Sequence, residues 1–257
     1  MTYLSSHKEC PSCGDNHKGN PYCLYENGAH CFSCGYTKSY DRSFSIQESR
    51  KVSIPELPNL KSRMEEFTLE NQLWLNKYYI TKDHVGQYHI SEAPDGALVF
   101  CNIDNNGDVT HYQMRYNTIP RRILSKGPKT PSISSIEAST IVLVEDYLSH
   151  IRVGELFDTA CLWGTKASYD FLKSLLPYTT ILVWLDNDSQ KEINSGQIAA
   201  KKICKMLESI LRLERRRFGF GGRQLPTIIN IATDNDPKVY SPSEIKNILG
   251  ACDAIPQ

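Results

Sequence analysis

The sequence lacks long apolar runs. Its longest runs, such as Thr140–Val144 and Ile181–Leu185, fall far short of the ~20 residues that cross a membrane as a helix. The first residues, Met1 to Lys8, also lack the apolar core of a secretory signal. These two absences predict a soluble protein of the cytoplasm with no membrane partner.

The sequence also lacks an excess of either charge. Lys and Arg together number 29, and Asp and Glu together number 29. Bulk positive charge, which holds many proteins on nucleic acid without sequence preference, is therefore excluded, and any such contact must come from local patches. Hydrophobic residues make up 40% of the 257 residues and charged residues 23%, so the chain has the composition of a folded protein.

Four of the nine cysteines form two close pairs. Cys10 with Cys13 and Cys31 with Cys34 give the spacing C-x₂-C-x₁₇-C-x₂-C. This spacing is typical of a four-thiolate zinc site, because two intervening residues let a tight turn aim both sulfurs at one point. We therefore predict a structural Zn²⁺ bound by these four cysteines in a zinc ribbon over residues 1–40. Four small buried thiols are the alternative.

His30 directly precedes Cys31 and is a second candidate zinc ligand. The paired cysteines favour the four-sulfur set. We therefore predict that His30 lies at the surface, on the hairpin turn of residues 26–28, where it contacts nucleic acid.

Residues 41–66 are polar and rich in serine, and Pro55 and Pro58 interrupt them. This composition is typical of a flexible linker. From residue 67 to 137 we predict a small basic α+β subdomain. A helix begins after the N-cap Thr68, with Leu69, Leu73 and Trp74 at helical spacing.

A β-hairpin follows that helix, formed by residues 97–103 and 109–115 around the Asn-Gly turn at Gly107. Residues 108–131 then carry a local charge of +4, because one aspartate stands against five basic residues. The five are Arg115, Arg121, Arg122, Lys126 and Lys129.

Residues 138–257 alternate between apolar strands and helices. This alternation predicts an α/β domain with a mostly parallel sheet covered by helices on both faces. The predicted strands are 140–144, 159–163, 179–185 and 227–232, and the predicted helices are 147–156, 168–176, 196–212 and 243–249.

Acidic residues follow three of these strands: Glu145, the pair Asp186 and Asp188, and Asp236. The carboxyl ends of parallel strands meet at one edge of the sheet, where α/β proteins place their chemistry. Gathered carboxylates repel one another, and a bound divalent cation such as Mg²⁺ removes that cost. Taken singly, each cluster also fits a turn or a helix cap.

This order of segments closely resembles the bacterial and phage replicative DNA primases, with a zinc ribbon, a basic subdomain and a Toprim (topoisomerase–primase) domain. The most specific matches are the two cysteine pairs, Leu143–Ser149, Leu162–Thr165, Leu185–Asp188 and Asp236-Pro237. Three positions depart from the family pattern. Asp146 replaces a glycine, Ser149 replaces an acidic residue, and Lys238 replaces an aspartate. The departures suit a phage-type enzyme, and we expect any helicase to be a separate protein.

The resemblance implies an α/β nucleotidyltransferase that synthesises short RNA primers on a single-stranded DNA template from ribonucleoside triphosphates. It implies Mg²⁺ or Mn²⁺ at Glu145, Asp186, Asp188 and Asp236. Arg115 and Lys126 are the candidates for binding triphosphate or template phosphate. Looser phosphate contacts are expected from Arg121, Arg122 and Lys129, and template contacts from His30.

Two other functions remain open from the residues. A Toprim-type nuclease would use the same carboxylates with water as the nucleophile. A non-catalytic zinc-ribbon DNA-binding adaptor would have lost activity through the changes at Asp146 and Ser149.

Overall fold

The computed structural model describes residues 3–7, 10, 12, 22–25, 28–31, 36–39, 60–104, 106–118, 122–187, 192–218 and 225–253. The chain divides into two compact units, Met1–Val52 and Ser53–Gln257. Four predicted site residues lie outside the described ranges: Cys13, Cys34, Arg121 and Asp188. In the described part of the chain, no helix is both long and apolar enough to cross a membrane.

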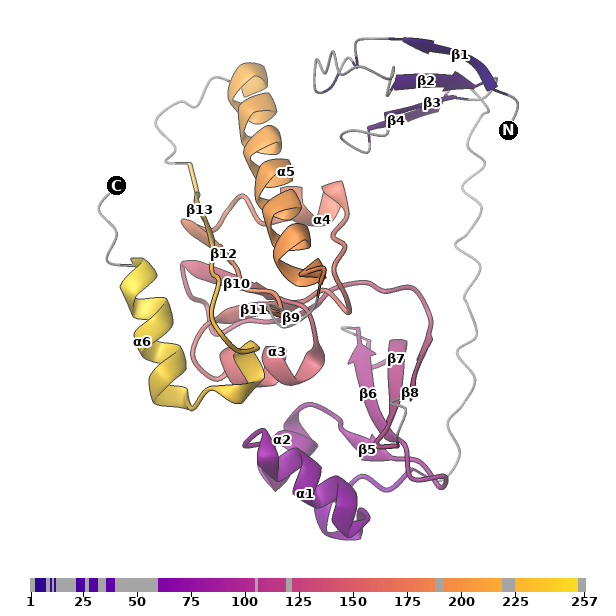
Figure 1. The fold of residues 1–257 in the computed structure, drawn as a ribbon, viewed down its shortest axis with the longest axis vertical. Coiled ribbons are helices and arrows are strands. Elements are labelled where there is room, and N and C mark those ends of the chain that lie inside the picture. The colour runs from indigo at the N-terminus through magenta and orange to yellow at the C-terminus, as the bar shows by residue number, and fades with distance from the viewer. Residues whose placement is uncertain are drawn as a thin grey trace. The chain divides into compact units, whose positions relative to one another are not determined.

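The first unit contains a four-stranded antiparallel sheet in the order β1-β2-β3-β4 (Figure 1). Its strands are β1 (Tyr3–His7), β2 (Tyr22–Tyr25), β3 (Gly28–Cys31) and β4 (Thr37–Ser39). Tyr25 pairs with Gly28, so β2 and β3 form the predicted hairpin. A small core lies against this sheet, made of Cys10, Tyr22, Ala29 and Cys31.

The second unit begins with short helices and a second antiparallel sheet, in the order β5-β6-β7-β8. The elements are η1 (Met64–Glu66), α1 (Leu69–Lys77), α2 (Lys82–Gln87), β5 (Ser91–Glu92), β6 (Leu98–Ile103), β7 (Val109–Tyr116) and β8 (Arg122–Lys126). The predicted hairpin corresponds to β6 and β7. Its turn contains Gly107 at φ +85, a backbone conformation that glycine adopts without a steric penalty.

The folded part of this unit begins earlier than its composition predicted. Lys61 forms a β-bridge with Glu92, and Met64 is buried in the core. Residues 60–66 therefore belong to the folded unit and not to the flexible linker predicted for 41–66. The rest of that predicted linker, 41–59, lies outside the described residues.

Glu92 organises the start of α1. Its fully buried carboxylate accepts hydrogen bonds from Lys61 Nζ at 2.8 Å, Thr68 N at 2.8 Å and Asn71 Nδ2 at 2.6 Å. Burial alone would raise the pKa of Glu92, but these hydrogen bonds outweigh it and lower the pKa. α1 begins after the N-cap Thr68, as predicted.

The predicted apolar face of α1 was wrong in part. Leu69 and Leu73 are 69% and 60% exposed. The helix turns Asn71 and Leu75 inward instead, because Asn71 supplies a donor to the buried carboxylate of Glu92. A polar partner deep in the fold thus overrides the helical spacing of the leucines.

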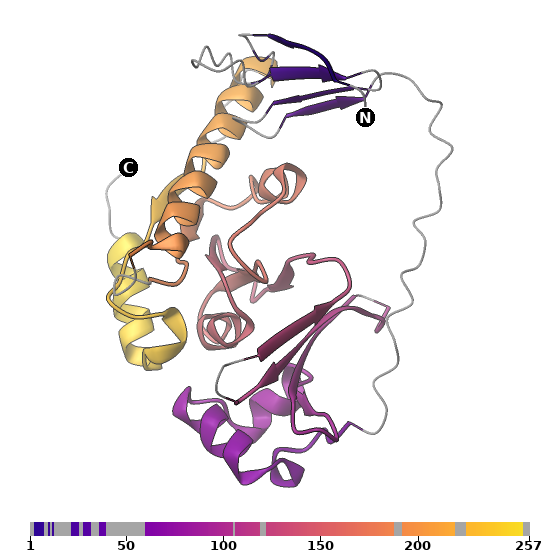
Figure 2. The same cartoon turned by 45° about the vertical axis from the view of Figure 1, so that its right-hand side comes forward.

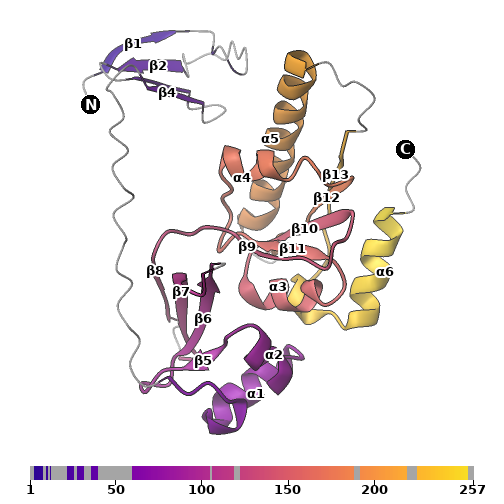
Figure 3. The ribbon, with the colours of Figure 1, turned by 180° about the vertical axis from the view of Figure 1, so that it is seen from behind.

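The third sheet has the order β13-β12-β10-β11-β9 and is mostly parallel (Figure 3). Its strands are β9 (Ser132–Ser134), β10 (Thr140–Val144), β11 (Asp158–Cys161), β12 (Thr180–Val183) and β13 (Thr227–Asn230). The four predicted strands are all present and parallel. The edge strand β9 is antiparallel to β11 and was not predicted, because it is short and only partly apolar.

Helices cover both faces of this sheet, as the strand–helix alternation predicted (Figure 2). α4 (Tyr169–Ser174) and α5 (Ser195–Phe218) pack on one face, where Leu143, Ile181 and Leu207 are buried together. α3 (Tyr147–Gly154) and α6 (Pro242–Asp253) pack on the other face, around Trp184.

An aromatic cluster joins the third sheet to the second. The Tyr147 ring stacks on Trp163, with centroids 4.8 Å apart and an interplanar angle of 15°. His111 of β7 meets the same indole edge-on. His150 is buried beside Tyr147, with Nε2 2.8 Å from Ser134 Oγ and Nδ1 2.9 Å from Thr159 Oγ1.

We expect this cluster to make the second unit less stable at acid pH. Burial lowers the pKa of His150 from 6.5 to about 3. The stability contribution of neutral His150 is complete above pH 6.5 and is lost as the pH falls toward 3, because the unfolded chain gains a proton first. Between pH 7 and 5.5 the free energy of unfolding should fall by about 1 kcal/mol from this residue.

Urea unfolding at both pH values measures this loss. His150→Gln keeps hydrogen-bonding groups for Ser134 and Thr159 but does not titrate, so its loss should be smaller by that amount. His89→Asn replaces an exposed histidine and should behave as the wild type. Equal losses in the wild type and His150→Gln would contradict the expectation.

Candidate functional site

The carboxylates predicted to converge lie at the carboxyl ends of the central strands. Glu145 follows β10, and Asp186 follows β12, which pairs with β10 in parallel. Both lie near the fully buried thiol of Cys161, at the end of β11. Burial raises the pKa of that thiol well above its ordinary value, and the charges of Asp146, Glu145 and Asp186 raise it further. The ends of β10 and β12 thus bring their acidic groups close to the end of β11.

A lysine ammonium lies among these carboxylates. Lys238 Nζ is 2.6 Å from Asp146 Oδ2, 2.7 Å from Asp236 Oδ2 and 3.2 Å from Asp186 Oδ2. Its side chain is only 7% exposed. Lys238 lies in the short helix η2 (Pro237–Val239), which packs against α3. The sequence marked Lys238 only as a departure from the family pattern, and its place at the centre of the cluster was missed.

The pKa values of the neighbouring aspartates follow from this arrangement. Burial and then the charge of Asp146 raise the pKa of Asp186 to about 8. Burial would also raise the pKa of Asp146, but the charge and hydrogen bond of Lys238 outweigh it and lower that pKa. The ammonium therefore stabilises Asp146 as a carboxylate more effectively than Asp186.

The loop after β12 is held in place by polar contacts. Asn187 donates from Nδ2 to the carbonyl of Thr233, and Asn194 donates to the Asn187 side chain. Gln197 donates from Nε2 to the carbonyl of Leu185 at 3.3 Å. These contacts connect the start of α5, the end of β12 and the segment after β13, so they fix the position of Asp186.

Gly196 makes the closest approach to this loop. A Cβ at this position would lie 2.0 Å from the backbone oxygen of Asp186 and 3.0 Å from its carbonyl carbon. Since the obstacle is backbone, no side-chain rotation can relieve the overlap. Glycine at this position is what lets α5 begin directly behind Asp186.

We expect Gly196→Ala to displace the Asp186 backbone and to lower the free energy of unfolding by about 1–3 kcal/mol, the usual cost of overpacking. Thermal unfolding of the full chain measures the loss. Gly250→Ala is the matched control, since a Cβ at Gly250 meets nothing within 4 Å. An unfolding midpoint for Gly196→Ala equal to that of the control would contradict the close approach.

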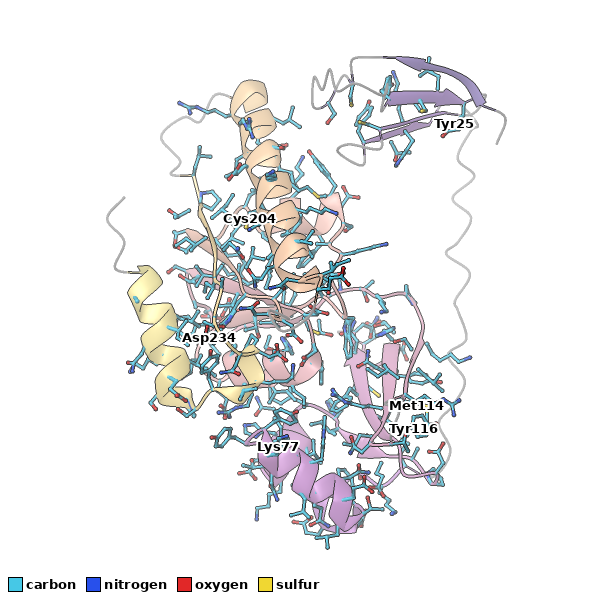
Figure 4. All side chains as sticks on the ribbon, viewed as in Figure 1. Tyr25, Lys77, Met114, Tyr116, Cys204 and Asp234 are labelled. Carbon is cyan, nitrogen blue, oxygen red and sulfur yellow. The ribbon has the colours of Figure 1, made fainter. Side chains whose placement is uncertain are left out.

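The described basic residues of the segment 108–131 differ in their burial. Arg115 is only 5% exposed, with its guanidinium 4.4 Å above the Trp74 ring. Arg115 is therefore a buried residue, and its contact with phosphate stays a prediction. Arg122 and Lys126 are exposed on β8, and the Arg122 guanidinium lies 5.1 Å from the Tyr116 ring. Met114 and Tyr116, neighbours of Arg115 on β7, are labelled in Figure 4.

Lys129, one of the predicted basic residues, lies near the loop that follows β11. A Cβ on Gly164 would lie 3.9 Å from Lys129 Nζ. The Gly164 amide in turn donates to the carbonyl of Glu145 at 2.9 Å. Trp163, the preceding residue, has φ 54, an uncommon conformation for an aromatic residue. The loop after β11 thus lies close both to the Lys129 side chain and to Glu145 at the end of β10.

Two of the four predicted zinc ligands are described, and both are buried. Cys10 is 1% exposed and Cys31 0%. The Ser12 amide donates to Cys10 Sγ at 3.4 Å, a contact that stabilises the negative charge of a metal-bound thiolate. The Cys31 amide donates to the Tyr36 carbonyl at 2.7 Å, so the described residues on either side of positions 32–35 lie close together. Both contacts fit a zinc site completed by Cys13 and Cys34.

His30 is not on the hairpin turn where the sequence placed it. It lies inside β3, opposite Cys23 on one side and Thr37 on the other. Its Nδ1 is 3.1 Å from Thr37 Oγ1. Because the sheet places it in a paired strand, its side chain is half-buried.

The carboxylate cluster suits a divalent cation on one side. Asp186 Oδ1 is buried and has no hydrogen-bond partner among the described residues, and such an oxygen is a ligand that Mg²⁺ and Mn²⁺ prefer. Within the described ranges, no three His, Cys, Asp or Glu side chains are grouped to hold a metal ion. The ammonium of Lys238 lies between three of the carboxylates, and Asp188 lies outside those ranges.

No family model matches the sequence, and no curated protein matches it either. Among solved structures, the chain is similar to the E. coli primase catalytic core, with a TM-score of 0.50. That match covers 70% of this chain and 71% of the other, at 15% sequence identity. The chain shares its fold with a primase catalytic core. The resemblance to primases that the sequence indicated is thus confirmed for the fold.

Two further structures are similar to the chain. The primase fragment of the bacteriophage T7 primase-helicase protein aligns over 97% of this chain and 99% of its own, at 15% identity and a TM-score of 0.49. A DNA primase domain from Pseudomonas aeruginosa aligns over 76% of this chain and 62% of its own, at 17% identity and a TM-score of 0.42.

Proposed function

We propose that this chain is a DNA primase that joins ribonucleotides into a short RNA primer on single-stranded DNA. The observation that carries the proposal is the meeting of Glu145, Asp146, Asp186 and Asp236 at one edge of a sheet with the primase fold. In such sheets the reaction takes place at the carboxyl ends of the strands.

In the proposed reaction, the 3′-hydroxyl of one nucleotide attacks the α-phosphate of the next, and pyrophosphate leaves. Glu145 and Asp186 would hold a divalent cation, with Asp188 as a further ligand, while Asp236, also predicted as a ligand, is ion-paired with Lys238. When bound, this cation lowers the pKa of the attacking hydroxyl and balances the phosphate charge. The carboxylates keep the reacting phosphate at this edge only through that cation, because they would otherwise repel it.

The basic side chains would bind the phosphates of nucleotide and template. The approach of Lys129 to Gly164, next to the Glu145 strand end, supports this role for Lys129. Lys126 and Arg122 are exposed on β8 and would contact the template backbone. Arg115, which is buried against Trp74, would support this strand instead of binding phosphate directly.

The zinc ribbon would contact a short template sequence, with Zn²⁺ bound by Cys10, Cys13, Cys31 and Cys34. Ribonucleoside triphosphates and single-stranded DNA are the proposed substrates. A separate replicative helicase is the proposed partner, in the cytoplasm of the host cell if a phage encodes the chain.

A template-directed assay tests the proposal. The full chain is incubated with single-stranded DNA of varied sequence, labelled ribonucleotides and Mg²⁺ or Mn²⁺. Labelled RNA of a few nucleotides is the expected product, and Glu145→Gln should abolish it. Shortened template without labelled RNA would establish a nuclease instead. Binding of template with neither product would establish a DNA-binding adaptor.

A further inference from the structure

Lys238 is unusual because its ammonium contacts three carboxylates from three separate segments. Asp146 is the N-cap of α3, Asp186 follows β12, and Asp236 precedes η2. An ammonium has three N–H donors and no acceptor. With partners at 2.6, 2.7 and 3.2 Å, all three donors are used, and none is left for a phosphate oxygen.

The position of this ammonium excludes a metal ion at the same place. Mg²⁺ binds oxygens at about 2.0–2.1 Å, so an ion ligated by the same three Oδ2 atoms would overlap Nζ. The side chain is 7% exposed and η2 packs against α3. Moving the ammonium out would break its three ion pairs and would open the packing of η2.

The other side of the cluster is arranged differently. Asp186 turns Oδ2 toward Lys238, while its Oδ1 is buried without a hydrogen-bond partner among the described residues. Glu145 is close enough for its charge to raise the pKa of Asp186. A buried carboxylate oxygen without a donor is costly unless a cation binds it.

We infer that the ammonium of Lys238 takes the place of one divalent cation in this cluster, so that the chain binds a single divalent ion on the Glu145 and Asp186 side. This inference rests on the proposed function only in placing a divalent ion at the cluster. Lys238 is then a permanent counter-ion for Asp146 and Asp236, and it bears on the reaction by positioning carboxylates, without contact to substrate.

Counting bound Mn²⁺ tests the inference without any measurement of activity. The zinc-loaded full chain is titrated with Mn²⁺ in the absence of nucleotide, and unbound Mn²⁺ is followed by its paramagnetic resonance signal. Ions at the cluster are those that Asp186→Asn removes. We expect one such ion in the wild type and two in Lys238→Met, which keeps the length of the side chain and loses its charge.

Lys246→Met is the matched control, because Lys246 is exposed on α6, and its count should stay at one. Equal counts in the wild type and Lys238→Met, whether one or two, would overturn the inference, as would no ion at all in the wild type. If Lys238→Met does not fold, Lys238→Asp, folded in the presence of Mn²⁺, provides the second count under the same criteria.

A parallel primer assay separates this inference from the proposed function. Labelled primers together with two ions in the wild type would leave the function standing and remove the inference. One ion in the wild type and two in Lys238→Met, without labelled primers, would support the inference and contradict the proposed function.

Discussion

Replacing Asp186 with asparagine is expected to lower primer synthesis by at least about 100-fold while making the protein more stable. The loss follows because the side chain supplies a cation ligand at the strand end, and such a cation contributes several kcal/mol to the transition state. The gain follows because the site disfavours a charge there, as the pKa of about 8 for Asp186 shows.

The stability gain has a defined pH dependence. A carboxyl whose pKa is raised from 3.8 to about 8 destabilises the folded state increasingly as the pH rises through that window, because the unfolded chain loses its proton first. Asparagine removes this effect. Without added divalent ion, the free energy of unfolding of Asp186→Asn should exceed that of the wild type by at least about 2 kcal/mol at pH 8, and by less at pH 5.

Primer synthesis and urea unfolding at both pH values measure the two effects. Asp234→Asn is the control, because Asp234 is exposed and lies two positions before Asp236 in the sequence (labelled in Figure 4). It makes no ion pair with Lys238 among the described contacts. This control should have the primer synthesis and the free energy of unfolding of the wild type, within experimental error. An Asp186→Asn protein that is less stable than the wild type at pH 8 would contradict the electrostatic account of this site.

Removing zinc is expected to unfold the first unit, Met1–Val52, and to leave the second unit folded. The described core of the first unit is small and contains Cys10 and Cys31 themselves. Apolar burial on this scale cannot offset the entropy of ordering the chain. Binding of structural Zn²⁺ contributes about 10–16 kcal/mol in comparable small domains. The free energy lost when zinc is removed should therefore exceed the free energy of unfolding of this unit.

Amide hydrogen exchange of the full chain measures this outcome. After chelation, β2 and β3 should lose protection, while β10 and β12 keep theirs. Cys31→Ser should reproduce the loss and should lower template-dependent priming. Cys23→Ser is the control, because Cys23 lies in the same sheet without belonging to the predicted ligand set. Protection of β2 and β3 that survives zinc removal would contradict the zinc-dependent fold.

The sequence predicted the third sheet well because its strands are short apolar runs between clear helix signals. β10 occupies Thr140–Val144, the predicted range, and every residue in it is buried. The inward face of α1 was not predictable, because it depends on Glu92, 21 residues from Asn71 in the chain. The spacing of apolar residues within the helix does not indicate a partner that is distant in the sequence.

The candidate site shows the same limit. Strand ends revealed Glu145, Asp186 and Asp236, since each follows an apolar run. Lys238 adds no periodic signal, and its contact with Asp146 spans 92 positions in the chain. The burial of Arg115 was equally hidden, because it depends on the packing of Trp74 from another element.

The connection between β8 and β9 is short. β8 ends at Lys126 and β9 begins at Ser132, so a few residues link the exposed cationic strand to the edge of the acidic sheet. Lys129 lies within this link, and β9 is held to β11 by its ladder. Lys129 is therefore anchored on both sides by paired strands, because β8 pairs with β7 and β9 pairs with β11.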